Sequence, residues 1–279
     1  MKKIGIALGG GGARGLCHIE FLKALDELDL KPSIISGTSI GAIIGSFYAA
    51  GVSGKEMEEL TEKVSLLDIR KMVDLNILNN QGLIKGKGVI DFLDKHLPIK
   101  KFEDLIIPLK IVACEFWNRK EYVFQTGDIL PAVRASISVP GVFEPVVINN
   151  TVLVDGGIVN PVPMNIIRND CDILIAIDVT GTNEPPKKNP KPSIFESVTI
   201  SFQIMESAFV ENQIIYHKPD IYIKPKLMNI QIFDFHKNRK IIESVSKDVT
   251  EFKNKISNLL DNKSKGFMQR FRRKTNIKN

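Results

Sequence analysis

A single serine stands between two glycines in an uncharged stretch of the N-terminal part of the chain. Ser39 lies in Gly37-Thr38-Ser39-Ile40-Gly41, a G-x-S-x-G pattern between two apolar runs. The pattern is typical of a nucleophile elbow, in which a strained turn between strand and helix lifts the serine oxygen out of the sheet edge. Gly37 and Gly41 suit such a turn, because a Cβ atom there would collide with neighbouring backbone. Short motifs also match by chance, so this one needs partners elsewhere in the chain.

A cluster of glycines near the N-terminus could bind a negatively charged oxygen. It reads Gly9-Gly10-Gly11-Gly12-Ala13-Arg14-Gly15. Consecutive glycines at the start of a helix leave backbone N–H groups uncrowded, and the helix dipole adds positive potential. Such donors suit the oxyanion of a tetrahedral acyl intermediate, where losing one donor typically slows the reaction roughly 100- to 1000-fold. The plainer interpretation is a tight turn that lets a helix pack on a sheet.

The same cluster allows two nucleotide-binding interpretations. Gly10, Gly12 and Gly15 match the dinucleotide fingerprint G-x-G-x-x-G. That fingerprint needs an acid roughly 20 residues further on to hold a ribose, and residues 36–39 at the end of the second expected strand contain none. A Walker loop needs Gly-Lys followed by Ser or Thr, and this loop ends in Ala-Arg-Gly. A nucleotide-binding protein therefore stays an alternative with incomplete motifs.

The best candidate for a base that activates Ser39 is Asp155. It ends an apolar run and is followed by Gly156 and Gly157, so it would project from a rigid strand into a loop that allows close approach. A carboxylate with a reference pKa of about 3.9 is a weak base. In a water-poor site, however, it can orient and deprotonate a serine hydroxyl that it contacts directly. Considered alone, the segment would be a plain Asp-Gly turn. The histidines are interpreted as structural or surface residues: His18, His96, His217 and His236.

The three blocks together resemble the signature of the patatin-like phospholipases. Their order and spacing agree with the family, and the resemblance spans roughly residues 3–180. Residues 82–86, 135–143 and 155–163 are similar to further segments of the family, whereas Glu20 stands where a glycine is usual. The chain looks most like the short bacterial members, which are similar to the catalytic domain of neuropathy-target-esterase proteins. Residues after about 180 depart more from the family.

The resemblance implies a three-layer α/β/α fold and a serine acyl hydrolase with a Ser39–Asp155 dyad. It implies that the N–H groups of Gly10, Gly11 and Gly12 form the oxyanion hole, with Arg14 supporting the loop or the charge. The expected substrates are acyl esters of phospholipids, lysophospholipids or neutral lipids, cleaved without a metal or another cofactor. Two other functions remain open: nucleotide binding through the glycine cluster, and a non-catalytic protein that binds a partner or a lipid.

The elements that must position these residues alternate between strands and helices, which predicts an α/β protein with a largely parallel sheet. The strands are expected at residues 3–8, 33–38, 108–114, 122–124, 146–148, 152–154, 172–178 and 220–224. The helices are expected at residues 16–25, 40–51, 56–64, 88–97, 129–136, 195–217 and 239–260. Residues 68–85 are interpreted as a surface excursion or lid, and residues 181–193 as a loop. Residues 33–52 contain no charge, but their Ser, Thr and Gly content argues against a membrane span.

Length and composition indicate a globular protein with one large domain or two small ones, and no domain break is apparent before about residue 262. The chain has 279 residues, 43% hydrophobic and 25% charged. Its three cysteines form no C-x-x-C pair, which argues against a disulfide scaffold and favours a reducing compartment. The apolar run 4–8 is too short for a signal peptide, so we expect a cytoplasmic protein.

The positive charge of the chain is concentrated at its end. The net charge is +6, and residues 262–279 contain seven Lys or Arg and no Asp or Glu. Residues 1–261 are therefore nearly neutral, which argues against a nucleic-acid partner. We divide the chain into an acyl hydrolase domain, residues 1–261, and a basic tail, residues 262–279. Phe267, Met268 and Phe271 alternate with the basic residues of the tail, as in segments that touch the inner face of a membrane. A disordered, solvated tail is the alternative.

Overall fold

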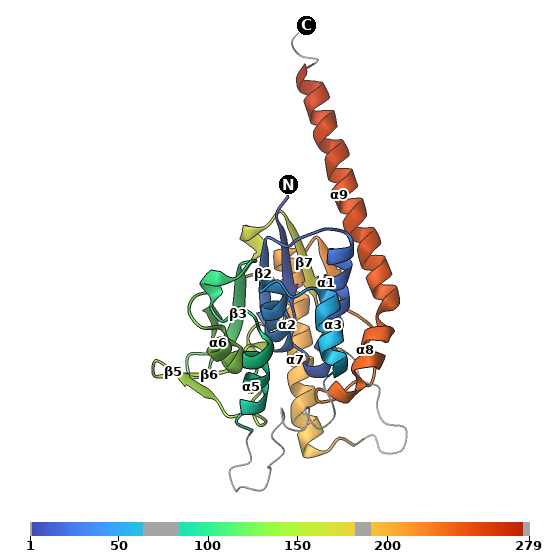
Figure 1. Ribbon diagram of the computed structural model, residues 1–279. Helices are drawn as coiled ribbons and strands as arrows, with labels where there is room; N and C mark the ends of the chain where they lie inside the picture. The colour runs from blue at the N-terminus through green and yellow to red at the C-terminus, as the bar shows by residue number, and fades with distance from the viewer. Residues whose placement is uncertain (1, 64–83, 182–190, 276–279) are drawn as a thin grey trace.

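The protein, described by a computed structural model over residues 2–63, 84–181 and 191–275, is built around a single mixed sheet (Figure 1). The strand order is β5-β6-β3-β2-β1-β7-β8, with β4 paired to β3. The strands are β1 Ile4–Leu8, β2 Ile34–Thr38, β3 Leu109–Glu115, β4 Lys120–Phe124, β5 Val146–Ile148, β6 Thr151–Asp155, β7 Ile173–Ile177 and β8 Ile221–Ile223. The pairs among β3, β2, β1, β7 and β8 are parallel, and those that involve β4, β5 and β6 are antiparallel. The prediction of an α/β fold with a largely parallel sheet is confirmed.

Helices cover both faces of the sheet, which gives three layers. In Figure 1, α1, α2 and α3 lie in front of the sheet and α7 lies behind it. The α-helices are α1 His18–Glu27, α2 Ile40–Ala49, α3 Gly54–Lys63, α5 Lys87–His96, α6 Ile129–Ser136, α7 Ile194–His217, α8 Asn238–Ser244 and α9 Ser246–Thr275. The short 3₁₀ helices are η1 Gly12–Cys17, η2 Phe102–Asp104, η3 Gly156–Ile158, η4 Arg168–Asp170 and η5 Phe235–Lys237.

The neighbouring strands β1 and β7 are apolar along their whole length because both of their faces are buried. In β1, Ile4, Ile6 and Leu8 belong to the main core beneath α1 and α2. Ala7 points to the opposite face, where a smaller core contains Val210 of α7. Successive side chains of one strand thus pack into two different cores, one on each face of the sheet.

Strands β2 and β6 meet end to end along one edge of β3. β2 pairs with the first four residues of β3, and β6 pairs with the last three. β4 pairs with the last five, so it occupies the opposite edge. Because β2 is parallel and β6 antiparallel to β3, their final residues, Thr38 and Asp155, lie opposite the neighbouring residues Val112 and Ala113. This register brings the segments that contain Ser39 and Asp155 together.

The C-terminal helical region differs from the prediction of one helix over residues 239–260. It forms two helices, α8 and α9, with a break at Val245. The break has a packing reason, because Ile241 and Val245 are fully buried and Phe252 of α9 packs edge-on against Phe21 of α1 with ring centroids 5.7 Å apart. The helix α9 also continues past residue 260 as far as Thr275.

Two predicted segments fall largely outside the described residues: the excursion or lid at residues 68–85 and the loop at residues 181–193. Within the part of the chain that the structure describes, none of the helices combines the length and apolarity needed to cross a membrane.

Candidate active site

Ser39 occupies a strained turn between β2 and α2. Its backbone has φ 55° and ψ −121°, a conformation that is uncommon for a residue with a side chain. The Ser39 N–H donates a 2.8 Å hydrogen bond to the hydroxyl oxygen of Ser136 in α6. The Ser136 hydroxyl in turn donates to the Val112 carbonyl at 2.6 Å. The strain is therefore held by a buried hydrogen-bond chain that ties the turn to β3, as expected for an elbow that presents its serine.

The two glycines around Ser39 allow α2 to approach the sheet. A Cβ atom on Gly37 would lie 2.5 Å from the Gly41 carbonyl oxygen. One on Gly41 would lie 2.1 Å from the carbonyl oxygen of Leu8 in β1. Both contacts are with backbone, which cannot move aside as a flexible side chain can. Glycine is thus required at both positions by close packing.

Asp155 ends β6 and is held in a buried position near Ser39. Its Oδ1 accepts a 2.7 Å hydrogen bond from the Gly157 N–H, and its own N–H donates to the Ser138 carbonyl at 2.9 Å. Burial is the largest influence on the carboxyl group and raises its pKa to about 6, although the Gly157 N–H and the Ser39 side chain favour the charged form. Among the described residues, no group makes a regular hydrogen bond to Oδ2. This oxygen is therefore free to take a proton.

The glycine cluster follows β1 and runs alongside the Ser39 turn, because Leu8 of β1 pairs with Gly37 of β2. The Gly10 N–H donates a 2.9 Å hydrogen bond to the Pro161 carbonyl, so it is not available as the expected oxyanion donor. Gly11 and Gly12 make no such bond within the described residues, and their N–H groups remain as donors. The next residue, Ala13, donates to the Ile232 carbonyl at 2.8 Å.

The cluster can only take this path with glycines. A Cβ atom on Gly11 would lie 2.3 Å from the Val179 carbonyl oxygen, and one on Gly12 2.4 Å from the Ile232 carbonyl oxygen. Gly12 also has φ +60°, in the left-handed region. Gly15 packs against Ile40, the residue after Ser39, where a Cβ atom would come within 2.2 Å of Cγ2. The cluster and the elbow are thus built against each other.

Arg14 and His18 hold the cluster from inside the protein. The Arg14 side chain is 1% exposed, and its Nε donates to the Gly11 carbonyl at 3.2 Å. The ring of His18 is fully buried, with Nε2 2.9 Å from the Gly9 carbonyl, which makes Nε2 the protonated nitrogen. Burial lowers the pKa of His18 to about 4, so the ring is neutral at neutral pH. This agrees with the interpretation of His18 as structural and leaves Asp155 as the base candidate.

Glycine is also required in the third block, at Gly156. A Cβ atom there would lie 2.3 Å from the Val112 carbonyl oxygen, so the end of β6 could not come so close to β3. The N–H of its neighbour Gly157 donates a hydrogen bond to Asp155. Because Gly157 has no side chain, carboxyl oxygens can lie close to the position that a Cβ atom would take.

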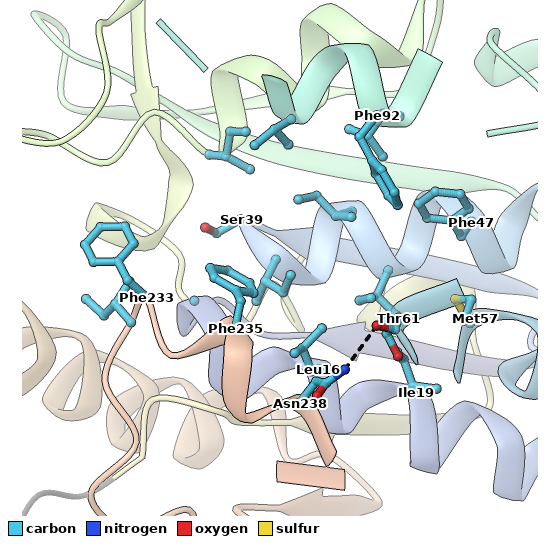
Figure 2. A pocket seen from close by; sticks show the side chains of 18 of the residues that line it. Leu16, Ile19, Ser39, Phe47, Met57, Thr61, Phe92, Phe233, Phe235 and Asn238 are labelled. Atoms are coloured by element: carbon cyan, nitrogen blue, oxygen red, sulfur yellow. Dashed lines mark hydrogen bonds between the residues drawn. The ribbon is translucent and has the colours of Figure 1, made fainter. Parts of the chain in front are cut away.

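An apolar cavity opens on one side of Ser39. It has a volume of about 180 Å³ and lies between α2, α3, α5 and the segment around η5. Figure 2 shows Ser39 on one side and Phe47 and Met57 on the other. The far wall is closed in part by a 3.0 Å hydrogen bond from the Asn238 amide to the Thr61 carbonyl, which ties α8 to α3. A hydrocarbon chain matches this lining.

A second, more polar cavity opens on the other side of Ser39. Its volume is about 460 Å³, and it contains Asp155, Arg14 and the glycine cluster together with residues of α7. Ser39 thus lies on the boundary between an apolar cavity and a second one that also contains charged side chains. No group of three or more His, Cys, Asp or Glu side chains arranged to hold a metal occurs within residues 2–63, 84–181 and 191–275.

The family model of patatin-like phospholipases matches residues 6–167, which is more than half of the chain. The chain belongs to the patatin-like phospholipase family. The matched range contains the glycine cluster, the Ser39 elbow and Asp155, so the resemblance on which the sequence prediction rested is confirmed.

Similar patatin-like proteins come from bacteria and eukaryotes. An uncharacterized NTE family protein of Mycobacterium tuberculosis is 32% identical over 193 residues, which cover 69% of this chain and 53% of that protein. Lysophospholipase NTE1 of Kluyveromyces lactis is 30% identical over 192 residues, covering 66% of this chain and 13% of that protein. The chain therefore spans about half the length of the mycobacterial relative, and a small part of the yeast one.

A solved structure supports the fold at low identity. VipD from Legionella pneumophila has a TM-score of 0.50 and 12% sequence identity, and the match covers 90% of this chain and 67% of VipD. At this identity the likeness concerns the patatin-like fold.

Two groups at the site are not expected from the sequence. Ser136 was part of a segment similar to the family, but its role in binding the Ser39 N–H depends on how α6 packs. Glu206 lies in the larger cavity although it is far from the three blocks in the sequence. It stands in the middle of a long helix with no glycine or motif beside it, so the sequence contains no local signal for it.

Proposed function

We propose that this patatin-like protein is a serine hydrolase of carboxylic esters of phospholipids or lysophospholipids, in which Ser39 is the nucleophile and Asp155 the general base. The observation that carries the proposal is the end-to-end meeting of β2 and β6 on β3, which places a strained serine beside a buried aspartate. The name of the yeast relative, a lysophospholipase, supports the substrate class.

In the first step, Ser39 Oγ attacks the carbonyl carbon of the ester and its proton passes to Asp155 Oδ2. The pKa of Asp155, about 6, is high enough to make the carboxylate a better base than an exposed aspartate. Because it is still below 7, the group is mostly ionised at neutral pH. The Gly157 N–H holds the other carboxylate oxygen and fixes its orientation. In the free protein, imperfect alignment of hydroxyl and carboxylate is common and tightens when substrate binds.

The tetrahedral oxyanion accepts hydrogen bonds from the N–H groups of Gly11 and Gly12. Arg14 adds positive charge behind them and fixes the loop through the Gly11 carbonyl. Collapse of the intermediate breaks the bond to the alcohol, which takes the proton from Asp155, and leaves an acyl group on Ser39. Water activated by the same carboxylate then releases the fatty acid.

The two cavities fit the two halves of such an ester. The apolar cavity of about 180 Å³ receives the acyl chain, and the cavity of about 460 Å³, which contains Arg14 and the two carboxyl groups, receives the alcohol part. A nucleotide has no hydrocarbon chain that would match the aliphatic and aromatic lining of the first cavity. The lining of the site therefore favours the lipid ester over the nucleotide-binding alternative.

The test combines labelling by a fluorophosphonate probe with hydrolysis of a panel of lysophospholipids. We expect the wild-type protein to be labelled and active, Ser39→Ala to be unlabelled, and Asp155→Asn to lose both properties while remaining folded. Each variant should lower the rate by at least about 1000-fold, as in other serine hydrolases.

The matched control is Ser201→Ala, which removes an exposed serine of α7. It should label and react like the wild type. Equal labelling and turnover of the wild type and Ser39→Ala would contradict the proposed mechanism, and a folded wild type that neither labels nor reacts would favour a non-catalytic role.

A further inference from the structure

A carboxyl group outside the three sequence blocks faces the candidate site. Glu206 lies in α7 and lines the larger cavity together with Ser39 and Asp155. Its Oε1 is 2.6 Å from the position that a Cβ atom on Gly157 would take, and Asp155 Oδ1 is 3.0 Å from the same position. The two carboxyl groups are therefore neighbours across Gly157. Hydrolysis by Ser39 and Asp155 leaves Glu206 without a role.

The charged groups around Glu206 come from three other elements. Asp155 at the end of β6 and Asp178 after β7 disfavour its ionisation, whereas Arg14 in η1 favours it. Burial is the largest influence, and together with the two aspartates it raises the pKa of Glu206 to about 8. At neutral pH the side chain is mainly a neutral acid that faces the cavity.

Arg14 supplies the positive charge of the same cavity. It lines the space beside Glu206, and its Nη1 atom is buried without a hydrogen-bond partner among the described residues. While Glu206 keeps its proton, the charge of Arg14 is not cancelled by this carboxyl group. When Glu206 ionises, it opposes that charge and adds a negative one to the cavity.

We propose that Glu206 is a specificity-determining residue that couples its protonation to the charge of the leaving group: in its neutral form it admits an anionic phosphate beside Arg14, and in its ionised form it excludes one. The inference rests on the proposed function. It concerns which esters are cleaved, and it assigns no bond-making step to Glu206.

The chemistry of a glycerol-based lipid places a phosphate in this space. With the ester carbonyl at Ser39, the glycerol backbone carries the phosphate into the cavity of about 460 Å³ that contains Arg14. A neutral Glu206 can donate its O–H to a phosphate oxygen. An ionised Glu206 repels the phosphate, and two charges several ångströms apart in a partly buried site change reactivity by about tenfold or more. A leaving group without charge does not experience this repulsion.

The experiment compares two esters with the same acyl chain in the same detergent micelles. One is a lysophosphatidylglycerol, whose phosphodiester keeps its negative charge over the range studied, and the other is a monoacylglycerol. The measured quantity is the ratio of kcat/KM for the two, from about one pH unit below to about one unit above the pKa of Glu206. Asp155, with a pKa of about 6, is already mainly ionised throughout this range, so its own charge changes little across the comparison.

We expect the ratio of phosphate ester to neutral ester to fall by about tenfold across this range in the wild type. In Glu206→Gln, which keeps the size of the side chain but cannot ionise, the ratio should stay flat. Glu211→Gln is the matched control, because Glu211 lies on the exposed side of the same helix. It should show the wild-type fall. Thermal unfolding of each variant checks that it is folded.

A wild-type ratio that stays constant while both esters are hydrolysed would overturn the inference. A fall of the same size in Glu206→Gln would do so as well. Both outcomes leave the proposed function intact, since the esters are still cleaved. Failure of the wild type to cleave either ester or to react with a fluorophosphonate would instead contradict the proposed function.

Discussion

Asp155 differs from an exposed aspartate in the free energy of its ionisation. The folded protein raises its pKa from 3.8 to about 6, chiefly by burial. A carboxyl group whose pKa is higher in the folded than in the unfolded state favours folding when protonated, and this advantage is lost as the pH rises through the folded pKa. At neutral pH the ionised carboxylate therefore costs stability. The raised pKa that lowers the stability of the folded protein at neutral pH also makes the carboxylate a stronger base.

Asp155→Asn should make the protein more stable at about pH 8, by about 1–3 kcal/mol, because the amide can keep the hydrogen bond from Gly157 and carries no charge. The gain should fall below about 1 kcal/mol near pH 4, where the carboxyl group of the wild type is mostly protonated. Urea unfolding at the two pH values measures both quantities. A variant that is no more stable than the wild type at the higher pH would show that the buried charge carries no cost.

A residue can be singled out from the sequence where it lies in a local pattern. Ser39 and Asp155 each stand beside glycines at the end of an apolar run, and the structure brings their segments together, while their catalytic roles stay predictions. The resemblance to the family implies Gly10 as an oxyanion donor, but its N–H donates to the carbonyl of Pro161, a partner 151 positions away that only the fold brings near. Glu206 has no local pattern, and its raised pKa arises from its surroundings in the tertiary structure.

At the scale of elements, α2 shows that glycines of one helix are not equivalent. Gly41 faces the Leu8 carbonyl oxygen, where a Cβ atom would come within 2.1 Å. Gly45, one turn further on, faces only side chains, the nearest being Ile35 Cγ2 at 3.3 Å from the Cβ position. The first glycine is needed for packing on the backbone of β1. At the second, a methyl group would require only small shifts of neighbouring side chains.

We expect Gly41→Ala to destabilise the protein by about 3 kcal/mol or more and to abolish labelling of Ser39, because α2 must move away from β1. Gly45→Ala should change stability by no more than about 1 kcal/mol, since the gain in helix propensity offsets the tight contact. Chemical denaturation of both variants makes the comparison. Similar losses in the two would mean that the register of α2 on the sheet is looser than this packing implies.

The elements themselves were largely predictable, because strands with continuous apolar runs alternate with amphipathic helices. The β5–β6 turn consists of Asn149 and Asn150, and both take positive φ, 48° and 63°, as asparagine readily does. The break at Val245 was not predictable, since the apolar period continues through it. The change of direction is set by tertiary packing, with Val245 buried completely.

At the scale of the whole molecule, α9 is the element that extends furthest from the sheet (Figure 1). Its helix continues through the first 14 residues of the basic tail, 262–275. We propose that this segment makes transient contact with anionic membranes, because each Lys or Arg near such a surface contributes about 1 kcal/mol. Its sequence combines these cations with aromatic residues.

A chain that ends at Asp261 should bind anionic vesicles at least about tenfold more weakly than the full chain, while both bind neutral vesicles poorly. Vesicle sedimentation measures the difference, and high salt should weaken binding of the full chain. Fluorophosphonate labelling of the shortened chain controls for folding. Unchanged binding to anionic vesicles after removal of the tail would contradict the proposal.

The shared edge of β3 has a consequence for how the length of this chain can vary. Because β2 and β6 end against consecutive residues of one strand, a residue inserted into either strand near its end would overlap the other or turn its side chains to the wrong face. Insertions can instead be absorbed where each strand begins, at residues 28–33 before β2 or in the asparagine turn before β6. The chain can therefore gain or lose residues only where each of these strands begins. Such changes leave the distance between nucleophile and base unaltered.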